Sequence, residues 1–206
     1  MAVQLATLAL SEELQMTEVM RDHKNNPFSF VRTRVSGARP LIRLCEQALM
    51  CPFGLSQWQE QERKTINLNV PSDAVNLKQF LAALDAKVKA HVWEHRAQLF
   101  KTPPSSMEIL ESFHKSLLRP GKQDYPDTLQ LKVTQHTKFF NPDKSEADSA
   151  VATKGCKMIA VISPTRIWTI PTSNEFGVGL ELRFAMVAPQ CSKTPEDIFG
   201  DVPLEW

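Results

Sequence analysis

The segment Val178-Gly179-Leu180-Glu181-Leu182-Arg183-Phe184-Ala185-Met186 alternates bulky apolar residues with small or charged ones over its whole length. Successive side chains of a β-strand point to opposite faces, so this period of two predicts a strand with one face on a core. The side chains expected on the core are Val178, Leu180, Leu182, Phe184 and Met186, with Gly179, Glu181 and Arg183 on the opposite face. This is the clearest strand signal of the sequence, and it favours a β-rich fold.

Further strands are predicted upstream of this segment. Residues 64–70 and 129–133 alternate apolar and polar side chains, and residues 158–162 form the apolar run of a buried strand. Residues 165–170 follow Ser163-Pro164, which we expect to separate two strands. The polar residues 141–153 between these strands predict a mobile loop.

The clear helical periodicity lies in residues 73–118, and residues 11–21 show only weak helical character. The stripe of a long helix is formed by Leu77, Leu81, Leu84, Val88 and Val92, with Lys78, Asp85, Lys89 and Glu94 outside it. A second helix is predicted after Pro104, where Ser105 and Glu108 form a capping-box pattern. Its predicted apolar face is Ile109, Leu110, Phe113 and Leu117.

The order of strands, two helices and strands predicts a mainly β (α+β) fold, an OB-like antiparallel barrel with a two-helix insertion near 73–118. Residues 40–191 are expected to form this domain. Residues 1–39 precede it as a segment whose structure the sequence leaves open, and residues 192–206 follow it as a flexible acidic tail.

Charge is distributed unevenly along the 206 residues. The formal net charge is only +1, but four acidic residues and no basic one follow Lys193, so the preceding residues carry +5. The four cysteines form no CxxC pair, which is typical of buried thiols in a reducing compartment. No signal-peptide pattern or long apolar run is present, so we expect an intracellular, soluble protein that binds no membrane.

Sequence motifs of enzymes are missing. The chain contains no phosphate-binding glycine loop, GxSxG or HExxH motif, so we expect no catalytic residues and no cofactor. His91 and His95 stand four residues apart on the long helix, where two imidazoles can share a metal. Since no third ligand can be named, ordinary helix histidines are favoured and no metal is expected.

Basic and aromatic residues are interleaved in the second half of the chain. Single strands of nucleic acid are held by cations along the phosphates and by flat rings under the bases. The candidate residues are Lys132, Lys138, Phe139, Phe140, Lys154, Lys157, Arg166 and Trp168. The alternative, equally compatible with residue types alone, is that Trp168 packs in the core and the lysines only solvate the surface.

A second basic group lies near the N-terminus, downstream of Phe28 and Phe30. Its members are Arg32, Arg34, Arg39 and Arg43. A solvated strand face is the favoured interpretation, and an arm that follows a nucleic-acid backbone is the alternative. Trp58 is either an exposed platform or a cap on the end of the barrel.

The C-terminal tail ends on an aromatic residue, Trp206. The residues expected to bind a partner are Asp197, Phe199, Asp201, Glu205 and Trp206, because a terminal ring and carboxylate fit a pocket with a basic rim. The tail can also occupy the basic groove of its own chain, or serve only for solubility.

Five segments in this order resemble a known family, the single-stranded-DNA-binding proteins of large nucleocytoplasmic DNA viruses. Those proteins are in turn similar to the OB-fold single-strand binders of short-tailed phages. The segments that carry the resemblance are Cys51–Ser56, Thr65–Val70, Leu84–Val88, Tyr125–Val133 and the closing element from Ile167-Trp168 to Gln190. The first forty residues match nothing in the family, and the loop at 141–153 lacks an expected glycine.

The resemblance implies sequence-tolerant binding of single-stranded DNA in viral replication, recombination or repair, with the tail recruiting replication proteins. It also implies a location in the host nucleus or at a cytoplasmic viral replication site. The alternative function is a structural or adaptor protein of virion or assembly that binds no nucleic acid. The sequence leaves the oligomeric state open, a homodimer included.

Overall fold

The computed structural model describes residues 4–45, 47–57, 64–123, 125–170 and 172–188. The helices are α1 (Leu8–Glu12), α2 (Val75–Glu94), α3 (Arg96–Leu99) and α4 (Met107–Phe113), with the 3-10 turn η1 at Ser149–Val151. The first eight strands are β1 (Gln4–Leu5), β2 (Leu14–Met16), β3 (Met20–Arg21), β4 (Pro27–Thr33), β5 (Ile42–Arg43), β6 (Leu49–Met50), β7 (Leu55–Gln57) and β8 (Lys64–Val70). The remainder are β9 (Leu118–Arg119), β10 (Asp127–Val133), β11 (Lys138–Phe140), β12 (Glu146–Ala147), β13 (Lys157–Ile170) and β14 (Glu175–Val187).

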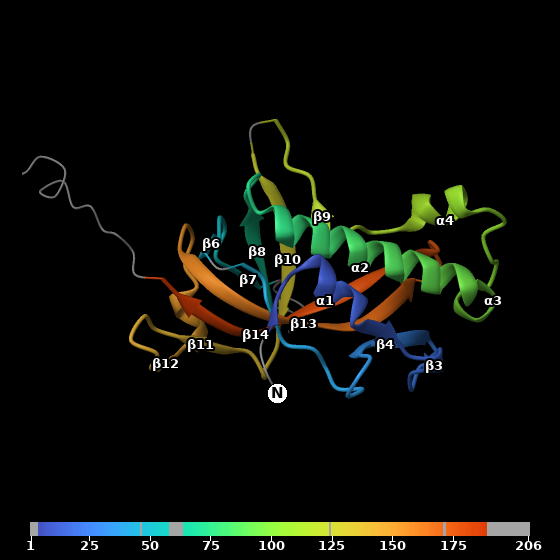
Figure 1. Cartoon of the computed structure of the whole chain (residues 1–206), viewed down its shortest axis with the longest axis horizontal. Coiled ribbons are helices and arrows are strands. Elements are labelled where there is room, and N and C mark those ends of the chain that lie inside the picture. Colours follow the sequence, from blue (N-terminus) through green and yellow to red (C-terminus); the bar gives the residue numbers. More distant parts are fainter. Residues whose placement is uncertain (1–3, 46, 58–63, 124, 171, 189–206) are drawn as a thin grey trace, which may run out of the picture.

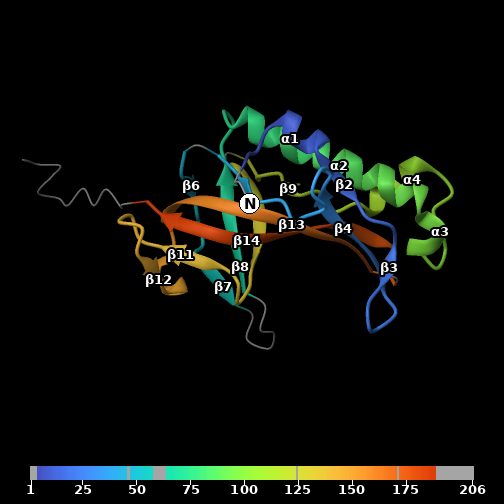
Figure 2. The same ribbon diagram turned by 60° about the horizontal axis from the view of Figure 1, so that its bottom comes forward.

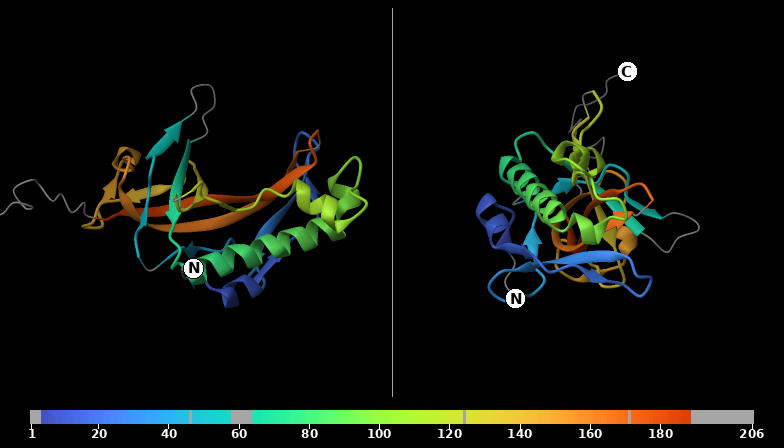
Figure 3. Two further views of the ribbon diagram at one scale, coloured as in Figure 1. Left: turned by 90° about the horizontal axis from the view of Figure 1, so that it is seen from above. Right: turned by 90° about the vertical axis from the view of Figure 1, so that its right-hand side faces the viewer.

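Two long antiparallel strands, β13 and β14, run through the whole molecule (Figures 1 and 2). The main path of the sheet is β1-β5-β13-β14-β10-β8-β7, and β4, β6 and β11 also pair with the two long strands. One end of this strand pair carries β11 and β12, and the other end carries β3 and β4 (Figure 2). Seen from above, the pair is bowed, and α2 lies along it (Figure 3).

Strand β14 confirms the predicted strand, but its alternation reverses partway along. Val161 pairs with Phe184 and Ile162 pairs with Leu182, so Arg183 is an extra residue that forms a β-bulge. Beyond the bulge Ala185 and Val187 are buried, whereas Phe184 and Met186 are only half-buried. The predicted inward orientation of Phe184 and Met186 is therefore wrong, because one extra residue moves all later side chains to the other face.

The predicted break at Ser163-Pro164 is also absent, since β13 runs continuously from Lys157 to Ile170. A second register shift lies between Pro164 and Ile167. A proline cannot donate to the ladder and is tolerated in a strand beside such an irregularity. The strand thus bends at this point instead of ending.

Helix α2 confirms the predicted long helix and its buried stripe, with Phe80 added. Asp85 was expected outside the stripe, yet it is only 8% exposed. Its carboxylate accepts hydrogen bonds from Ser116 Oγ (2.9 Å) and the Leu117 amide (3.1 Å). These two bonds satisfy Oδ2, whereas Oδ1 lies 3.3 Å from His114 Nε2, and both of these buried atoms lack a hydrogen-bond partner among the described residues.

The second predicted helix is shorter than expected and is preceded by the single turn α3. Ser106 is the N-cap of α4, in place of the predicted Ser105, and accepts a hydrogen bond from the Ile109 amide. The helix ends at Phe113, and the next residues become extended because the Lys115 amide bonds to the Phe176 carbonyl at the edge of β14. Leu117, predicted on the helix, is buried in this extended segment.

The sheet does not close into the predicted barrel. Within the described residues, its path ends at β1 on one side and at β7 on the other, and these two strands do not pair. Parallel pairs (β1 with β5, and β14 with β10 and β11) also interrupt the predicted antiparallel order. Because β13 and β14 are about twice as long as β8 and β10, they extend beyond the region that those strands could enclose.

The N-terminal residues, left open by the sequence, belong to the same structure. Strand β4 pairs with β13, and Leu10, Leu14 and Val31 are part of the core. The predicted mobile loop at 141–153 contains β12, which pairs with β11, and the turn η1. No helix of the described residues is long and apolar enough to span a membrane. Trp58 and the tail, with its predicted partner-binding residues, lie outside the described residues.

Candidate nucleic-acid interface

The strand register places several aromatic and basic residues on one face of the β13–β14 pair. Directly paired residues share a face, and alternate residues along a strand return to it. The core lies on the face of Ile162, Leu180 and Ile167. We call the opposite side the outer face, and its main residues are Phe28, Phe30, Arg32, Lys132, Lys138, Phe140, Lys157, Arg166, Trp168, Gly177, Gly179 and Phe184.

The β4 end of the outer face carries the densest aromatic and basic cluster. The rings of Phe28 and Phe30 meet edge to face at 5.1 Å. The guanidinium of Arg32 lies 4.3 Å from the Phe30 ring, and that of Arg166 lies 5.8 Å from the Phe28 ring. Arg166 is exposed and the two rings are half-buried, so each ring keeps only part of its surface open to a ligand.

Trp168 lies over glycine on the neighbouring strand. It pairs with Gly177, and a Cβ added to Gly177 would approach Trp168 Cζ2 to 2.9 Å and the Lys115 carbonyl oxygen to 3.0 Å. Glycine therefore allows the indole to lie flat on the backbone. The ring is half-buried, which lies between the open ring expected for base stacking and the alternative of a core residue.

Lys132 lies beside the glycines of β14, with Nζ 3.6 Å from the position of a Cβ on Gly179. Its register partner Glu181 is only 7% exposed and is held by Thr134 Oγ1 (2.8 Å) and Arg183 Nη1 (2.9 Å). Elsewhere along this face, Glu175 is ion-paired with Lys115 at 2.7 Å. These carboxylates are neutralised locally, so they repel an approaching polyanion less than isolated ones would.

Asp85 holds the extended segment that borders Trp168. From its position on α2, the Asp85 carboxylate accepts hydrogen bonds from Ser116 Oγ and the Leu117 amide. The Lys115 amide donates a hydrogen bond of 2.8 Å to the Phe176 carbonyl of β14. The His114 ring packs 5.2 Å from that of Phe176. The buried carboxylate thus fixes the backbone of Lys115 next to Gly177.

At the β11 end, the structure separates the two predicted phenylalanines. Phe139 is 3% exposed and lies on the core face, between Ala147 and Ala185 in the register. The prediction that Phe139 stacks on bases is therefore wrong. Phe140 and Lys138 point to the outer face, where Phe140 is half-buried with its ring 6.4 Å from that of Phe184. Lys138 is exposed and ion-paired with Glu146 at 3.0 Å.

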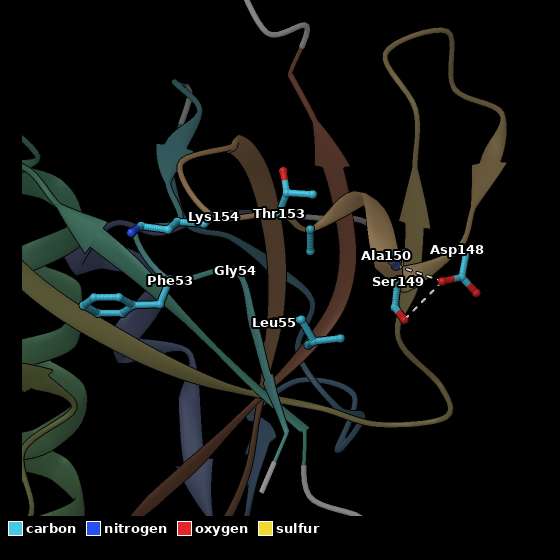
Figure 4. Close-up of a pocket in the computed structure, with 9 residues that line it drawn as sticks. Phe53, Gly54, Leu55, Asp148, Ser149, Ala150, Thr153 and Lys154 are labelled. Carbon is cyan, nitrogen blue, oxygen red and sulfur yellow. Dashed lines mark hydrogen bonds between the residues drawn. The ribbon is translucent and has the colours of Figure 1, made fainter.

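Lys154 and Lys157 lie near this end but apart from the aromatic cluster of β4. Lys157 is exposed beside Met50 of β6. Lys154 lines a hollow of about 470 Å³, in which its side chain lies on the same side as the ring of Phe53 and Asp148 lies across from it (Figure 4). Phe53 is 64% exposed, and Gly54 (φ +72°) lets the chain pass against the backbone of Lys154.

The His91 and His95 pair has a structural explanation. His91 Nε2 is 2.9 Å from Ser29 Oγ on β4, and the two imidazole rings are 4.5 Å apart. Burial, with the nearby His95, lowers the pKa of His91 to about 4, so this imidazole is neutral at pH 7. No group of three or more metal-ligating side chains occurs among the described residues.

Two parts of this face, and Phe53 in the separate hollow beside Lys154, were not predicted from the sequence. Phe28, Phe30 and Arg32 were interpreted as a solvated strand, although their alternation already placed them together on one side. Phe184 was assigned to the core because the bulge at Arg183 is not visible in the pattern. Phe53 was seen only as part of a turn.

Comparison with known proteins shows a similar fold in solved structures but no related sequence. No protein-family model matches the sequence, and no curated protein matches it. In three dimensions the chain is similar to single-stranded-DNA-binding proteins of bacteriophages. The likeness to gp2.5 of bacteriophage T7 has a TM-score of 0.52 at 13% identity and covers 82% of this chain and 98% of that one. At this identity it shows a shared fold.

A second phage protein gives a weaker likeness. The single-stranded DNA-binding protein of bacteriophage Enc34, in a C-terminally truncated form, has a TM-score of 0.48 at 13% identity and covers 86% of this chain and 96% of that one. The same protein in complex with single-stranded DNA has a TM-score of 0.46 at 12% identity, with coverages of 82% and 93%.

Proposed function

We propose that this chain binds single-stranded DNA through the outer face, without catalysis. The observation that carries the proposal is the alternation of rings and cations along one side of the β13–β14 pair. Phe28, Phe30 and Trp168 stand among Arg32 and Arg166 at one end, and Phe140 and Phe184 stand beside Lys138 at the other. The shared fold with a phage single-stranded-DNA-binding protein supports it.

The chemistry of this face suits a flexible strand better than a duplex. Unpaired bases can stack on exposed ring faces, at about 1 to 3 kcal/mol per base, and every base has such a face. Arg32 and Arg166 lie against Phe rings, so a base on the ring can have its phosphate near the guanidinium. Such binding tolerates any sequence.

The first test is a titration of oligo-dT across salt concentrations, followed by fluorescence anisotropy. Affinity is expected to fall with a log–log slope near −0.7 for each phosphate that the protein neutralises, because bound cations release counterions from the strand. Duplex DNA of equal length should bind more weakly, since paired bases offer no free face.

The runner-up function makes different predictions in the same experiment. A structural or adaptor protein would leave oligo-dT free at physiological salt, and this result would refute the proposal. Equal affinity for duplex would indicate a general polyanion binder. Light scattering of the same samples would test the homodimer.

A role in DNA replication, recombination or repair rests on the tail. We propose, on the resemblance to the family of large nucleocytoplasmic DNA viruses, that Trp206 and the acidic residues around it dock replication proteins. The −4 charge of residues 194–206 should also compete with DNA for the basic body.

Ending the chain at Lys193 is expected to tighten oligo-dT binding several-fold at low salt, with the gain shrinking as salt rises, because ions screen the tethered charges. Deleting Trp206 alone keeps every acidic side chain and serves as the control, with DNA affinity unchanged. If both chains bind oligo-dT like the intact protein at low salt, the tail does not compete. If the chain without Trp206 captures the same replication proteins as the intact chain, the tail does not dock them through the Trp206 ring.

A further inference from the structure

A second hollow, with a basic lining, lies at the β4 end of the molecule, outside the outer face. It has a volume of about 380 Å³ and is formed by the β3–β4 turn, by α3 and by the two residues that follow α3. Its polar lining includes Arg21, Lys24, Asn26, Gln98 and Lys101. No aspartate or glutamate lines it. The lining of cations and amides is typical of sites that receive phosphate oxygens.

Asp22, the acidic residue of the β3–β4 turn, does not line the hollow, because its carboxylate is hydrogen-bonded within the turn. Asp22 Oδ1 accepts hydrogen bonds from the Asn26 amide (2.8 Å) and the Lys24 amide (2.9 Å). These bonds, that from Asn26 foremost, lower the pKa of Asp22 and keep it ionised within the turn. Arg21 Nη1 donates to the Asn25 carbonyl (3.0 Å), which braces the same turn. The turn is thus held by Asp22 and Arg21, whereas Lys24 and Lys101 are exposed.

The hollow and the aromatic cluster lie at the same end of β4 but on opposite faces of it. Pro27 lines the hollow and pairs with Arg21, whereas the next residue, Phe28, points to the outer face and starts the row of Phe28, Phe30 and Trp168. A strand that leaves the ring of Phe28 and passes round the end of β4 therefore meets the exposed Lys24 and Lys101. The hollow itself offers these cations but no ring for stacking, because Phe100, the aromatic residue of its lining, is only 4% exposed.

We infer that this hollow holds the backbone phosphates of the same single strand, beyond the nucleotides whose bases stack on the outer face. The inference rests on the proposed function and deepens it. It assigns the hollow to electrostatic extension of the binding site, with no base stacking there. Lys24 and Lys101 bind the phosphates, and Arg21 positions the turn.

The test is oligo-dT binding by the double variant Lys24→Gln, Lys101→Gln, with strands of about 4 to 20 nucleotides that bracket the range of OB-fold sites. The matched control is Lys89→Gln, Lys122→Gln, which removes the same charge from α2 and from the loop before β10. Arg21 is left intact because it braces the turn.

Long strands should bind the Lys24, Lys101 variant more weakly, because two phosphates are no longer neutralised. The ratio of the affinity of the intact chain to that of the variant should be larger at low salt than at high salt. Between roughly 1 M and roughly 0.1 M salt, this ratio should rise about 5-fold for each lost phosphate contact, or about 25-fold for two. The salt slope of this variant should fall by about 1.4 on long strands. Strands too short to reach the hollow should bind both variants and the intact chain alike.

Three outcomes would overturn the inference while leaving the proposed function standing. They are an equal loss of affinity on short and long strands, an equal loss in the control variant, and no loss at any length. Absence of binding by the intact chain at every length would overturn the proposed function and this extension with it.

Discussion

Replacing Phe139 by alanine is expected to lower the free energy of unfolding by about 3 to 5 kcal/mol, the usual cost of removing a core aromatic ring. Phe139 is 3% exposed, and its neighbours across both strands are alanines, Ala147 and Ala185. These small side chains cannot fill the space that the ring leaves. Urea denaturation followed by circular dichroism measures the change, which is a large part of the total stability of a typical domain.

The adjacent residue provides the matched control. Phe140 points to the outer face and is half-buried, so Phe140→Ala should cost much less stability and should instead weaken oligo-dT binding. Phe139→Leu keeps most of the buried volume and should lie between the alanine variant and the intact chain. If Phe140→Ala proves the more destabilising of the two alanine variants, the assignment of faces on β11 is wrong.

Regular elements were predictable where one local pattern determined them. The stripe Leu77 to Val92 is set by helical spacing alone, and β8 and β10 follow from strict alternation. The end of α4 was not predictable from local pattern, because the extended segment after Phe113 depends on Lys115 bonding to Phe176, which lies far along the chain. Likewise Asp85 is a core residue because Ser116 Oγ and the Leu117 amide, both far along the chain, donate hydrogen bonds to it.

The candidate interface residues were chosen by residue type, which does not assign them to a face. The register places Trp168, Arg166, Lys132, Lys138 and Phe140 on the outer face. Neighbouring residues of a strand point to opposite faces, so only one of Phe139 and Phe140 can lie on the outer face, and the register is needed to decide which. The bulge at Arg183 had a larger effect, since it moves Phe184 from the core to the outer face and cannot be read from apolar periodicity.

Trp168→Ala is expected to weaken oligo-dT binding by about 1 to 3 kcal/mol, or roughly 5- to 150-fold, the range measured for aromatic residues that stack on bases. The indole lies on the backbone of Gly177, between the Phe28 end of the outer face and Lys132. Because it is supported by backbone on one side and half-buried, it needs little ordering when a base arrives, and this favours stacking.

Trp93→Ala is the matched control for the loss of an indole. Trp93 lies on α2 and is half-buried, with the Arg96 guanidinium 4.1 Å from its ring. This variant should lose some stability through its core contacts while keeping its affinity for oligo-dT. Both proteins should be assayed well below their unfolding midpoints, so that any loss of affinity is not a loss of folded protein.

If Trp168→Ala unfolds the chain, Trp168→Phe replaces it, since a smaller ring over Gly177 keeps a stacking surface and should recover part of the affinity. Unchanged binding by a folded Trp168→Ala protein would remove Trp168 from the interface and leave Phe28 and Phe30 as the stacking residues.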